Sequence, residues 1–430
     1  MSVRQEPEID KFKTIPQAEH GINPNKLCPY ASDVVRDLQE AGYEAYLVGG
    51  SVRDLLLGKI PKDFDVATNA TPEEVQGVFP RCHLIGRRFR LAHVRKRGAL
   101  IEVATFRGQA TAGNERAKLN GRILRDNVFG TVEEDAIRRD FTINALFLDP
   151  VGGDIRDYVG GYQDLADRHL RLIGDPETRY REDAVRLLRA ARFVAKLGVE
   201  PVKETAAPTR ELAPLLKDIP PARLFEEVCK LFLTGHGRRS MEALQRFGLS
   251  STLFPTLKKG HGPGKIHMGT LLSKALENTD ERVRKSKPVT PAFLFAALLW
   301  QPVRDKVQAL MEKGESEQDA LMLAAEDVIS AQVRSTAIPR RFSAVTRQIW
   351  AMQPRFGKTG GKRWRRLLEQ QKFRAAYDFL LLRAEEDPSL LELCAFWTKA
   401  QVGVDFSRNA RAGRDRARRR HHRRRAPSSA

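Results

Sequence analysis

The chain has 430 residues, of which 41% are hydrophobic and 30% charged, and this composition is typical of folded proteins with two or three domains. The longest strongly apolar run, at 293–300, is too short to cross a bilayer, and the N-terminal residues contain no signal-peptide core. The four cysteines are scattered, which argues against a zinc site or a disulfide framework. We therefore expect a soluble, cytoplasmic protein with reduced thiols.

The net charge of +20 comes from 74 basic and 54 acidic residues and is concentrated in two stretches. Residues 340–374 hold eleven basic residues and one acid, and residues 408–430 hold ten arginines and one acid. Charge of this density indicates a polyanionic partner, because each bound phosphate releases counterions. In the first stretch aromatic residues interleave with basic ones, which suits nucleic acid, although the aromatics could equally form a helical core. For the tail, a surface that merely keeps the protein soluble is also a fair interpretation.

The pattern of apolar residues changes along the chain. Residues 1–29 are predicted to be irregular, and from 43 to about 173 short strands alternate with helices and glycine turns, which predicts an α/β unit. Beyond residue 175, apolar spacings of three and four predict an almost entirely helical second part. The last 25 residues are rich in arginine and nearly devoid of apolar residues, so we expect disorder there.

A glycine turn at 46–59 (YLVGGSVRDLLLGK) is the first motif. A short strand is followed by Gly49, Gly50 and a helix, and the free N–H groups and positive dipole end at such a helix start suit a triphosphate. Ser51 would add a hydroxyl donor and Arg53 a positive charge. An ordinary strand–turn–helix corner with Ser51 as N-cap is the alternative, and the motif taken alone favours it.

Two aspartates, Asp63 and Asp65, follow in a run with strand character (KDFDVAT). Residues two apart in a strand point to one face, so both carboxylates converge while Phe64 and Val66 face the core. Converging carboxylates repel each other unless a cation lies between them, and Mg²⁺ takes one or two carboxylates together with substrate phosphates. A two-metal site is therefore expected. Isolated Asp-x-Asp pairs are common on surface loops, and the preceding glycine turn is what strengthens this one.

Two further groups of charged residues have two interpretations each. Glu102, in a predicted strand, is either another acid of the site or a solvent-facing residue. Arg138 and Arg139 could hold phosphate or ribose, and Asp140 could accept from a ribose hydroxyl or support the metal. A helical ion-pair network with the acids at 133–135 is the alternative.

One helix is predicted across 179–193 (RYREDAVRLLRAARF), with Asp183, Arg186, Arg189 and Arg192 recurring along one side. Three arginines in such a row repel one another unless an anion lies against them, and a solvated stripe is the alternative. Asp183 accepts and Arg186 donates, which matches the hydrogen-bonding pattern of adenine and cytosine. Guanine and uracil present the opposite pattern, and such mismatches can cost ~10⁴-fold in discrimination. This pair does not separate adenine from cytosine.

Four motifs in this order resemble the class II nucleotidyltransferase superfamily, which holds bacterial poly(A) polymerases and tRNA CCA-adding enzymes: GGSVRDLLLG, DFDVAT, RRDFTIN and REDAVRLLRAARF. The resemblance runs from about residue 10 to 400. The polymerases are the closer match, because IGRRFRLAHV at 85–94 and DIPPARLFEE at 218–227 are similar to their sequences. One departure is Ala184, where the polymerases commonly have the proline that favours a first helical turn.

The resemblance implies an α+β fold, with a mixed sheet in an N-terminal catalytic head and an all-helical remainder. It implies that Asp63 and Asp65 bind Mg²⁺ and that Asp140 is a third catalytic acid. Together with the glycine turn it gives these expected nucleotide contacts: Gly49, Gly50, Ser51, Arg53, Arg138, Asp183, Arg186, Arg189 and Arg192. We expect an irregular extension at 1–29, the head at 30–173, a base-recognising helical neck at 174–235, a helical body and RNA-binding region at 236–405, and a disordered tail at 406–430.

The expected activity is template-independent transfer of AMP from ATP to RNA 3′ ends, with release of pyrophosphate and a role in RNA processing and decay. RNA is expected to bind at Arg340, Arg341, Lys362, Arg363, Arg365, Arg366, Arg418, Arg419 and Arg420. The expected partners are RNA 3′ ends, ATP and RNA-decay proteins, with no membrane. A tRNA CCA-adding enzyme, which uses CTP and stops after three nucleotides, is the nearest alternative. A non-catalytic RNA-binding protein is disfavoured because the acids are intact.

Overall fold

The computed structural model describes residues 12–86, 90–108, 118–119, 122–123, 128–361, 364–404 and 406. The chain divides into two compact units. The N-terminal unit comprises Met1–Arg186 and Gly198–Pro208, and the helical unit comprises Leu187–Leu197 and Thr209–Ala430. Within the described ranges, no helix is long and apolar enough to pass through a membrane.

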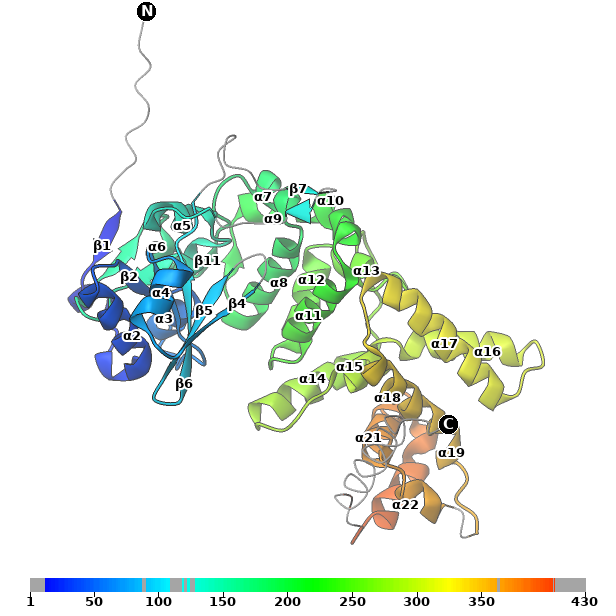
Figure 1. Ribbon diagram of the computed structural model, residues 1–430. Helices are drawn as coiled ribbons and strands as arrows, with labels where there is room; N and C mark the ends of the chain where they lie inside the picture. Colours follow the sequence, from blue (N-terminus) through cyan, green and yellow to red (C-terminus); the bar gives the residue numbers. More distant parts are fainter. Residues whose placement is uncertain are drawn as a thin grey trace, which may run out of the picture. The chain divides into compact units, whose positions relative to one another are not determined.

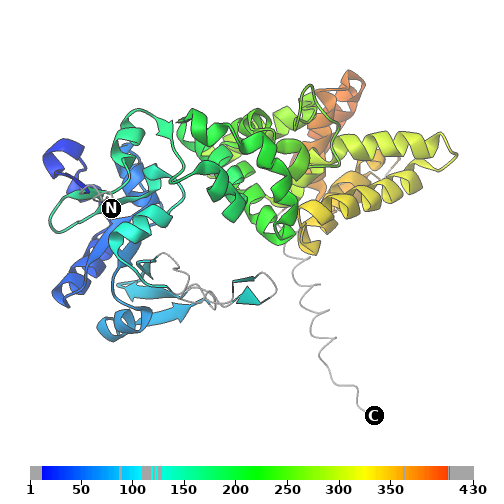
Figure 2. The same ribbon diagram turned by 90° about the horizontal axis from the view of Figure 1, so that it is seen from above.

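The N-terminal unit is built on a sheet with the strand order β1-β10-β9-β2-β3-β6-β5-β4 (Figure 1). Its strands are β1 (Lys13–Ile15), β2 (Ala45–Val48), β3 (Asp65–Thr68), β4 (Cys82–Ile85), β5 (Leu91–Lys96), β6 (Ala99–Thr105), β9 (Leu146–Leu148) and β10 (Ile155–Asp157). Among the strands of this sheet only β3 and β6 pair in parallel, so the sheet is mixed, as the family resemblance implied. The irregular extension predicted at 1–29 is wrong for its described residues, because β1 pairs with β10 in this sheet and a helix and a 3-10 turn follow it. Seen from above, β4 and β5 (light blue) lie at one edge of it (Figure 2).

Short helices and two small strand pairs complete this unit. The helices are α1 (Gln17–His20), α2 (Pro29–Glu40), α3 (Gly50–Leu56), α4 (Pro72–Val78), α5 (Val132–Arg138), α6 (Gly161–Ala166), α7 (Pro176–Glu182) and α9 (Lys203–Ala206), with 3-10 turns η1 (Pro24–Lys26) and η2 (Thr142–Asn144). The small pairs are β7 (Lys118–Leu119) with β8 (Arg122–Ile123) and β11 (His169–Leu170) with β12 (Glu200–Pro201). Thr71 and Thr131 start α4 and α5 with capping boxes, which satisfy N–H groups that a helix leaves unpaired.

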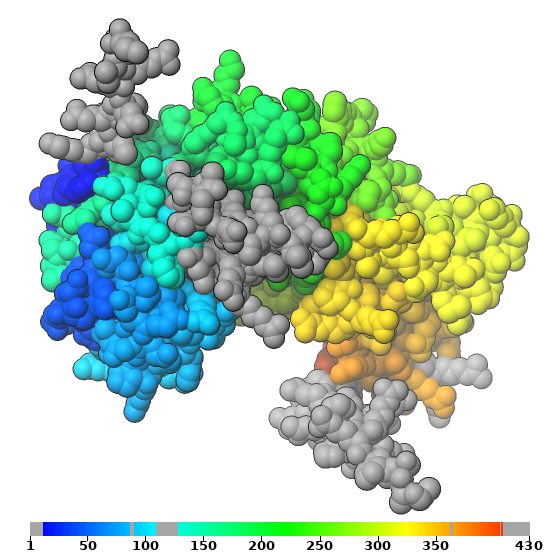
Figure 3. Space-filling model, turned by 45° about the horizontal axis from the view of Figure 1, so that its top comes forward, coloured from blue at the N-terminus to red at the C-terminus, as the bar shows by residue number. Residues whose placement is uncertain are grey.

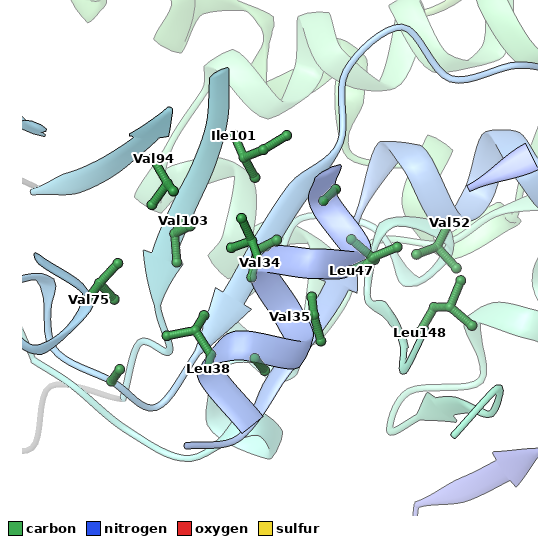
Figure 4. Packing of buried hydrophobic residues seen from close by; sticks show 14 of the residues in the cluster. Val34, Val35, Leu38, Leu47, Val52, Val75, Val94, Ile101, Val103 and Leu148 are labelled. Atoms are coloured by element: carbon green, nitrogen blue, oxygen red, sulfur yellow. The ribbon is translucent and has the colours of Figure 1, made fainter. Parts of the chain in front are cut away.

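One face of the sheet is covered by α2 and α4. Val34 and Leu38 of α2 pack with Ile101 and Val103 of β6 in a continuous buried cluster (Figure 4). Each of these side chains is at most 3% exposed, and burying one stabilises the fold by roughly 1.5–3 kcal/mol. This packing fixes which side of β3 and β6 faces the interior.

The opposite face is covered only in part. Tyr46, Phe106 and Phe147 form an aromatic cluster there together with Val132 and Ala136 of α5. The rings of Tyr46 and Phe147 meet edge to face with centroids 6.2 Å apart, an arrangement that ring quadrupoles favour. This cluster buries the face over β9, β2 and β3 and leaves β3 with an exposed first residue.

The helical unit contains helices and 3-10 turns among its described residues, in agreement with the predicted all-helical second part. They are α8 (Val185–Leu197, whose first residues belong to the N-terminal unit), α10 (Thr209–Leu212), η3 (Ala213–Asp218), α11 (Pro221–Phe232), α12 (Gly237–Arg246), α13 (Ser250–Leu253), α14 (Thr270–Arg284), α15 (Pro291–Leu298), α16 (Trp300–Met311), α17 (Glu317–Ser335), α18 (Arg340–Ala351), α19 (Gln353–Phe356), α20 (Arg365–Leu368), α21 (Phe373–Ala384), η4 (Pro388–Leu390) and α22 (Leu391–Ala400).

Three of the five aromatic residues of the basic stretch at 340–374 form helical core. Trp350, Phe356 and Phe373 are completely buried, and the indole N–H of Trp350 donates to the carbonyl of Ala296 at 3.1 Å. Phe356 also meets Trp397 edge to face at 5.2 Å. Packing is therefore observed for these three aromatics, whereas Phe342 and Trp364 are half-buried with Arg341 and Arg365 over their rings.

The buried face of α2 generates a prediction about stability. Leu38→Ala should lower the free energy of unfolding by about 2–5 kcal/mol, because it leaves a cavity in a side-chain cluster that excludes solvent. Urea denaturation of the Leu38→Ala variant measures this free energy. Glu40→Ala, which changes an exposed side chain of the same helix, is the control. Equal midpoints for the two variants would show that α2 does not hold the sheet.

Candidate active site

The glycine turn of the sequence follows β2 directly. Gly49 has φ 72° and ψ −127°, a backbone conformation that strongly favours glycine. A Cβ atom at this position would lie 3.3 Å from the Nη1 atom of Arg139, so the absence of a side chain also lets that guanidinium approach the turn. Gly50 then begins α3. The predicted strand, turn and helix are thus observed in order.

Ser51 lies in the first turn of α3 and is not its N-cap, so the alternative interpretation of this residue is wrong. Its side chain is buried, and its hydroxyl donates to the carbonyl of Val48 at 3.0 Å. The N-cap position belongs to Gly49. The hydroxyl therefore ties the turn to the end of β2.

Arg53 is an inward-facing cation of the same turn. Its side chain is only 4% exposed, and its Nε and Nη2 atoms donate to Asp54 Oδ1 at 2.9 and 2.6 Å. Its Nη1 atom donates to Asn144 Oδ1 at 2.5 Å, and the Asn144 amide donates in turn to Asp140 Oδ1 at 3.1 Å. Asn144, which was not among the predicted site residues, therefore connects the glycine turn with Asp140.

The side chains of Arg138 and Arg139, the two arginines of the RRDFTIN motif, contact different parts of the N-terminal unit. Arg139 donates to Asp135 Oδ2 through Nε and Nη2 at 3.0 and 2.8 Å, and its Nη1 atom lies beside the Gly49 turn. Arg138, the arginine named in the expected site, donates instead to the carbonyl of Gly108. The ion pair with Asp135 matches the helical network that was the alternative interpretation. Arg139 is nevertheless the arginine that the structure brings to the glycine turn.

The aspartate pair lies at the start of β3. Asp63 precedes the strand, Asp65 begins it, and both are exposed, while Phe64 packs against the core and Val66 is buried within it. The alternation predicted for KDFDVAT is therefore observed. On the neighbouring parallel strand, Glu102 is the register partner of Asp65.

The electrostatics of Asp65 single out its neighbours. Desolvation by the surrounding protein raises the pKa of its carboxyl first, the negative charge of Glu102 raises it further, and Asp63 adds to the effect. Arg139 acts in the opposite direction. Glu102, which the sequence left undecided, is thus an electrostatic neighbour of Asp65, and Arg139 is the cation that opposes the rise in the pKa of Asp65.

The donor set suits a hard divalent cation. Carboxylate oxygens are the ligands that Mg²⁺ prefers, and a cation would offset the repulsion that raises the pKa of Asp65. Within the part of the chain that the structure describes, no three His, Cys, Asp or Glu side chains converge as a complete metal site. Asp63 and Asp65 could offer carboxylates to such an ion, whose remaining positions water and substrate phosphates can fill.

The helix predicted across 179–193 is wrong at its centre. α7 ends at Glu182, Asp183 is extended with φ −150° and ψ 96°, and α8 begins at Val185. The physical reason is local: the Asp183 carboxylate accepts the N–H of Val185 at 3.2 Å, which competes with continuation of the helix. The break lies at Ala184, where a proline would be tolerated.

The arginines of this segment have anionic neighbours in the protein itself. The guanidinium of Arg186 donates to Glu182 Oε2 at 3.0 Å and to the carbonyl of Arg179 at 2.5 Å. Within the helical unit, the Arg192 guanidinium lies 3.3 Å from Glu227 Oε2 of α11, and Arg189 lies over the ring of Phe193. The repulsion expected along this row is thus relieved in part by protein carboxylates.

The expected RNA-binding residues fall into two groups. Arg340, Arg341, Arg365 and Arg366 are exposed in α18 and α20 of the helical unit. Lys362, Arg363, Arg418, Arg419 and Arg420 lie outside the described residues. The first group shows that cationic side chains of 340–374 are presented to solvent.

Three family models match the chain. The poly A polymerase head domain matches residues 45–171, the probable RNA and SrmB-binding site of polymerase A matches 198–260, and the polymerase A arginine-rich C-terminus matches 313–429. These matches cover the glycine turn, the aspartate pair and the cationic C-terminal region.

The chain is similar to several curated proteins along most of its length. Poly(A) polymerase I of Escherichia coli O6:H1 is 50% identical over 400 residues, which cover 91% of this chain and 86% of that protein. Poly(A) polymerase I of Haemophilus influenzae is 49% identical over 395 residues, 90% of this chain and 87% of that one. The CCA-adding enzyme of Geobacillus thermodenitrificans is 38% identical over 230 residues, 54% and 55% of the two chains.

Solved structures show the same fold. The CCA-adding enzyme of Bacillus stearothermophilus in complex with CTP has a TM-score of 0.57 and 26% identity, covering 88% of this chain and 84% of that one. The Thermotoga maritima CCA-adding enzyme complexed with tRNA has a TM-score of 0.54 at 20% identity, covering 80% and 75%. Identity near one half over nine tenths of the chain separates the polymerases from the CCA-adding enzymes, which are distant relatives. The chain belongs to the bacterial poly(A) polymerase I family of nucleotidyltransferases.

Proposed function

We propose that this protein extends RNA 3′ ends with adenylates taken from ATP, without a template and with release of pyrophosphate. The observation that carries the proposal is 50% identity to poly(A) polymerase I across 91% of the chain, together with the head-domain match at 45–171, which contains the glycine turn and the aspartate pair. The CCA-adding alternative is disfavoured because those relatives match only about half of the chain. Intact acids at 63 and 65 disfavour a non-catalytic RNA-binding protein.

The catalytic part of the proposal uses the N-terminal unit. Asp63 and Asp65 would hold Mg²⁺, which when bound supplies the charge that stabilises the attacking and leaving oxygens of phosphoryl transfer. The Gly49 turn lets phosphates approach the backbone closely, and Arg139 adds a cation beside it. Asp140 is retained as a third acid, held through Asn144 to the same turn.

The nucleotide would be selected by the segment around Asp183. We assign base recognition to Asp183 and Arg186, since an acceptor next to a donor suits adenine or cytosine and leaves guanine and uracil with unmatched polar groups. Arg138, Arg189 and Arg192 complete the proposed nucleotide contacts with Gly49, Gly50, Ser51 and Arg53. Solved relatives with bound CTP and with an ATP analogue are consistent with a nucleotide site in this fold.

RNA would be held by cations without sequence preference. The proposed contacts are Arg340, Arg341, Lys362, Arg363, Arg365, Arg366, Arg418, Arg419 and Arg420, where counterion release supplies the affinity. The proposed domains are the head at 30–173, to whose sheet β1 adds a strand from the predicted extension at 1–29, the neck at 174–235, the body at 236–405 and the tail at 406–430. A role in RNA processing and decay, with decay proteins as partners, belongs to this proposal.

Removal of one acid tests the catalytic assignment. Asp63→Ala should lower the rate of AMP incorporation about 10³-fold or more, because several kcal/mol of transition-state stabilisation are lost. The affinity for RNA should stay nearly unchanged. Rates with radiolabelled ATP and filter binding of RNA measure the two quantities. Asp33→Ala, which removes an aspartate from the far side of the sheet on α2, is the matched control. Near wild-type incorporation by Asp63→Ala would remove Asp63 from the site.

The link between the glycine turn and Asp140 is tested at Asn144. Asn144→Ala leaves the buried Arg53 guanidinium without one of its acceptors, so unfolding should become easier by about 1–3 kcal/mol. The KM for ATP should rise as well, because the turn and Asp140 are no longer joined. An unchanged KM for ATP together with an unchanged thermal midpoint would show that the Asn144 amide contributes neither to ATP binding nor to stability.

Truncation tests the tail. A chain ending at residue 407 should bind RNA more weakly, and the dependence of log K on log salt should flatten by about 0.7 for each single-strand phosphate contact removed. Titrations of a short oligoadenylate at several salt concentrations provide both values. If the salt slope of the truncated chain equals that of the full-length chain, the ten arginines beyond residue 407 make no phosphate contacts.

A further inference from the structure

Among the residues that the structure describes, part of the sheet face that carries Asp65 has no helix packed over it. The aromatic cluster buries this face over β9, β2 and β3, but over β6, β5 and β4 the same face carries exposed side chains. Leu100 of β6 and Ile85 of β4 are 52% and 50% exposed although both are large and apolar. In the space-filling view the light-blue chain around residues 75–100 lies at the surface of this unit (Figure 3). An uncovered sheet face beside the acids is a candidate binding surface.

Strand register arranges polar side chains of this face in a row. Asp65 of β3 pairs with Glu102 of β6, and Glu102 pairs with His93 of β5. His93 pairs with His83 of the edge strand β4. The Nε2 atom of His93 lies 3.6 Å from Glu102 Oε1, so the two side chains are turned toward each other. The row runs from acids at β3 to imidazoles at β4.

A second, parallel row ends in two arginines. Leu100 pairs with Arg95, and the backbone N–H of Arg95 donates to the carbonyl of Arg81 at 3.0 Å, which places the two arginines opposite each other. Both are exposed, and among the described residues neither guanidinium has a hydrogen bond or an ion pair. Like charges directly opposite on neighbouring strands destabilise a sheet. An anion bound between Arg81 and Arg95 would remove that cost.

The strand order indicates from which side of Asp65 an RNA 3′ end would approach. Val48 at the end of β2 pairs with Asp65, and the Gly49 turn follows at once, so the turn proposed for the triphosphate lies on the β2 side of Asp65. Glu102 and the two rows lie on the opposite, β6 side. In an in-line displacement the attacking oxygen arrives opposite the leaving group. If pyrophosphate leaves toward the turn, the attacking 3′-hydroxyl approaches over β6.

We propose that the exposed face of β6, β5 and β4 binds the 3′-terminal nucleotides of the RNA primer, with Arg81 and Arg95 on its phosphates. The inference rests on the proposed function and adds a primer site to it. From β3 to β4 the face spans about 14 Å, since neighbouring strands lie ~4.8 Å apart. The exposed apolar atoms of Leu100 and Ile85 and the ring of His83 offer bases a stacking surface that accepts any sequence.

Substitution of the arginine pair separates this surface from the nucleotide site. In the full-length protein, Arg81→Ser with Arg95→Ser should raise the KM for a short oligoadenylate primer about tenfold. The salt slope of primer binding should decrease by about 1.4, because each single-strand phosphate contributes ~0.7. The KM for ATP should stay unchanged. Arg36→Ser, which removes an exposed arginine from α2 on the other face, should leave both KM values at the wild-type level.

Each outcome of this experiment decides the inference. An unchanged primer KM in the double variant, with wild-type polymerisation intact, would overturn it, and so would equal increases in both KM values at an unchanged thermal midpoint. Arg95→Lys, which keeps the charge, should retain most of the primer affinity. A primer with 4-thiouridine at its 3′ end should photocrosslink to peptides of β4 or β5, and crosslinks confined to other segments would contradict the assignment. An inactive wild-type protein would instead overturn the proposed function.

Discussion

The proposed active site depends on the register of β3 between its two neighbours. Antiparallel pairing with β2 brings Val48, and with it the Gly49 turn, beside Asp65, while parallel pairing with β6 brings Glu102 to the other side. A slip of one residue would turn every side chain of β3 to the opposite face. Val66, buried in the core beneath α2, opposes that slip, so the hydrophobic effect holds the acids in the exposed positions.

Segments distant in sequence are then joined by buried polar contacts. Arg53 of the turn reaches Asn144, and Asn144 reaches Asp140, so the turn and the third motif are connected by hydrogen bonds that are strong because their partners are charged. Asp135 orients Arg139 toward Gly49 in the same way. These contacts hold a positively charged turn next to a negatively charged strand start, which is the polarity that a nucleotide triphosphate and a divalent cation require.

Much of this arrangement was predictable because it follows from local patterns. Alternation of polar and apolar residues identified β3 and the exposure of Asp63 and Asp65, and the Gly-Gly pair identified the turn. The mixed sheet followed by helices was confirmed. What depends on register was not predictable: Glu102 was left undecided because its neighbour on β3 is 37 positions away in sequence.

Other differences arise from competition between local interactions. The spacing of Asp183 with the arginines after it suggested one helix, but the aspartate side chain captures a backbone N–H and ends α7. The sequence gives no reason to distinguish Arg138 from Arg139. Because α5 ends between them, Arg138 donates to Gly108 while Arg139 lies beside the glycine turn. Aromatic residues among arginines looked like a stacking surface, whereas Trp350 and Phe356 are core.

Product length on a denaturing gel tests the central claim most directly. Purified protein with Mg²⁺ would receive a generic RNA, and separately a tRNA lacking its 3′ end, with ATP alone or CTP alone. The account predicts a long ladder on the generic RNA with ATP and little extension with CTP. Addition of only a few nucleotides, confined to the tRNA and requiring CTP, would contradict it and make the protein a CCA-adding enzyme.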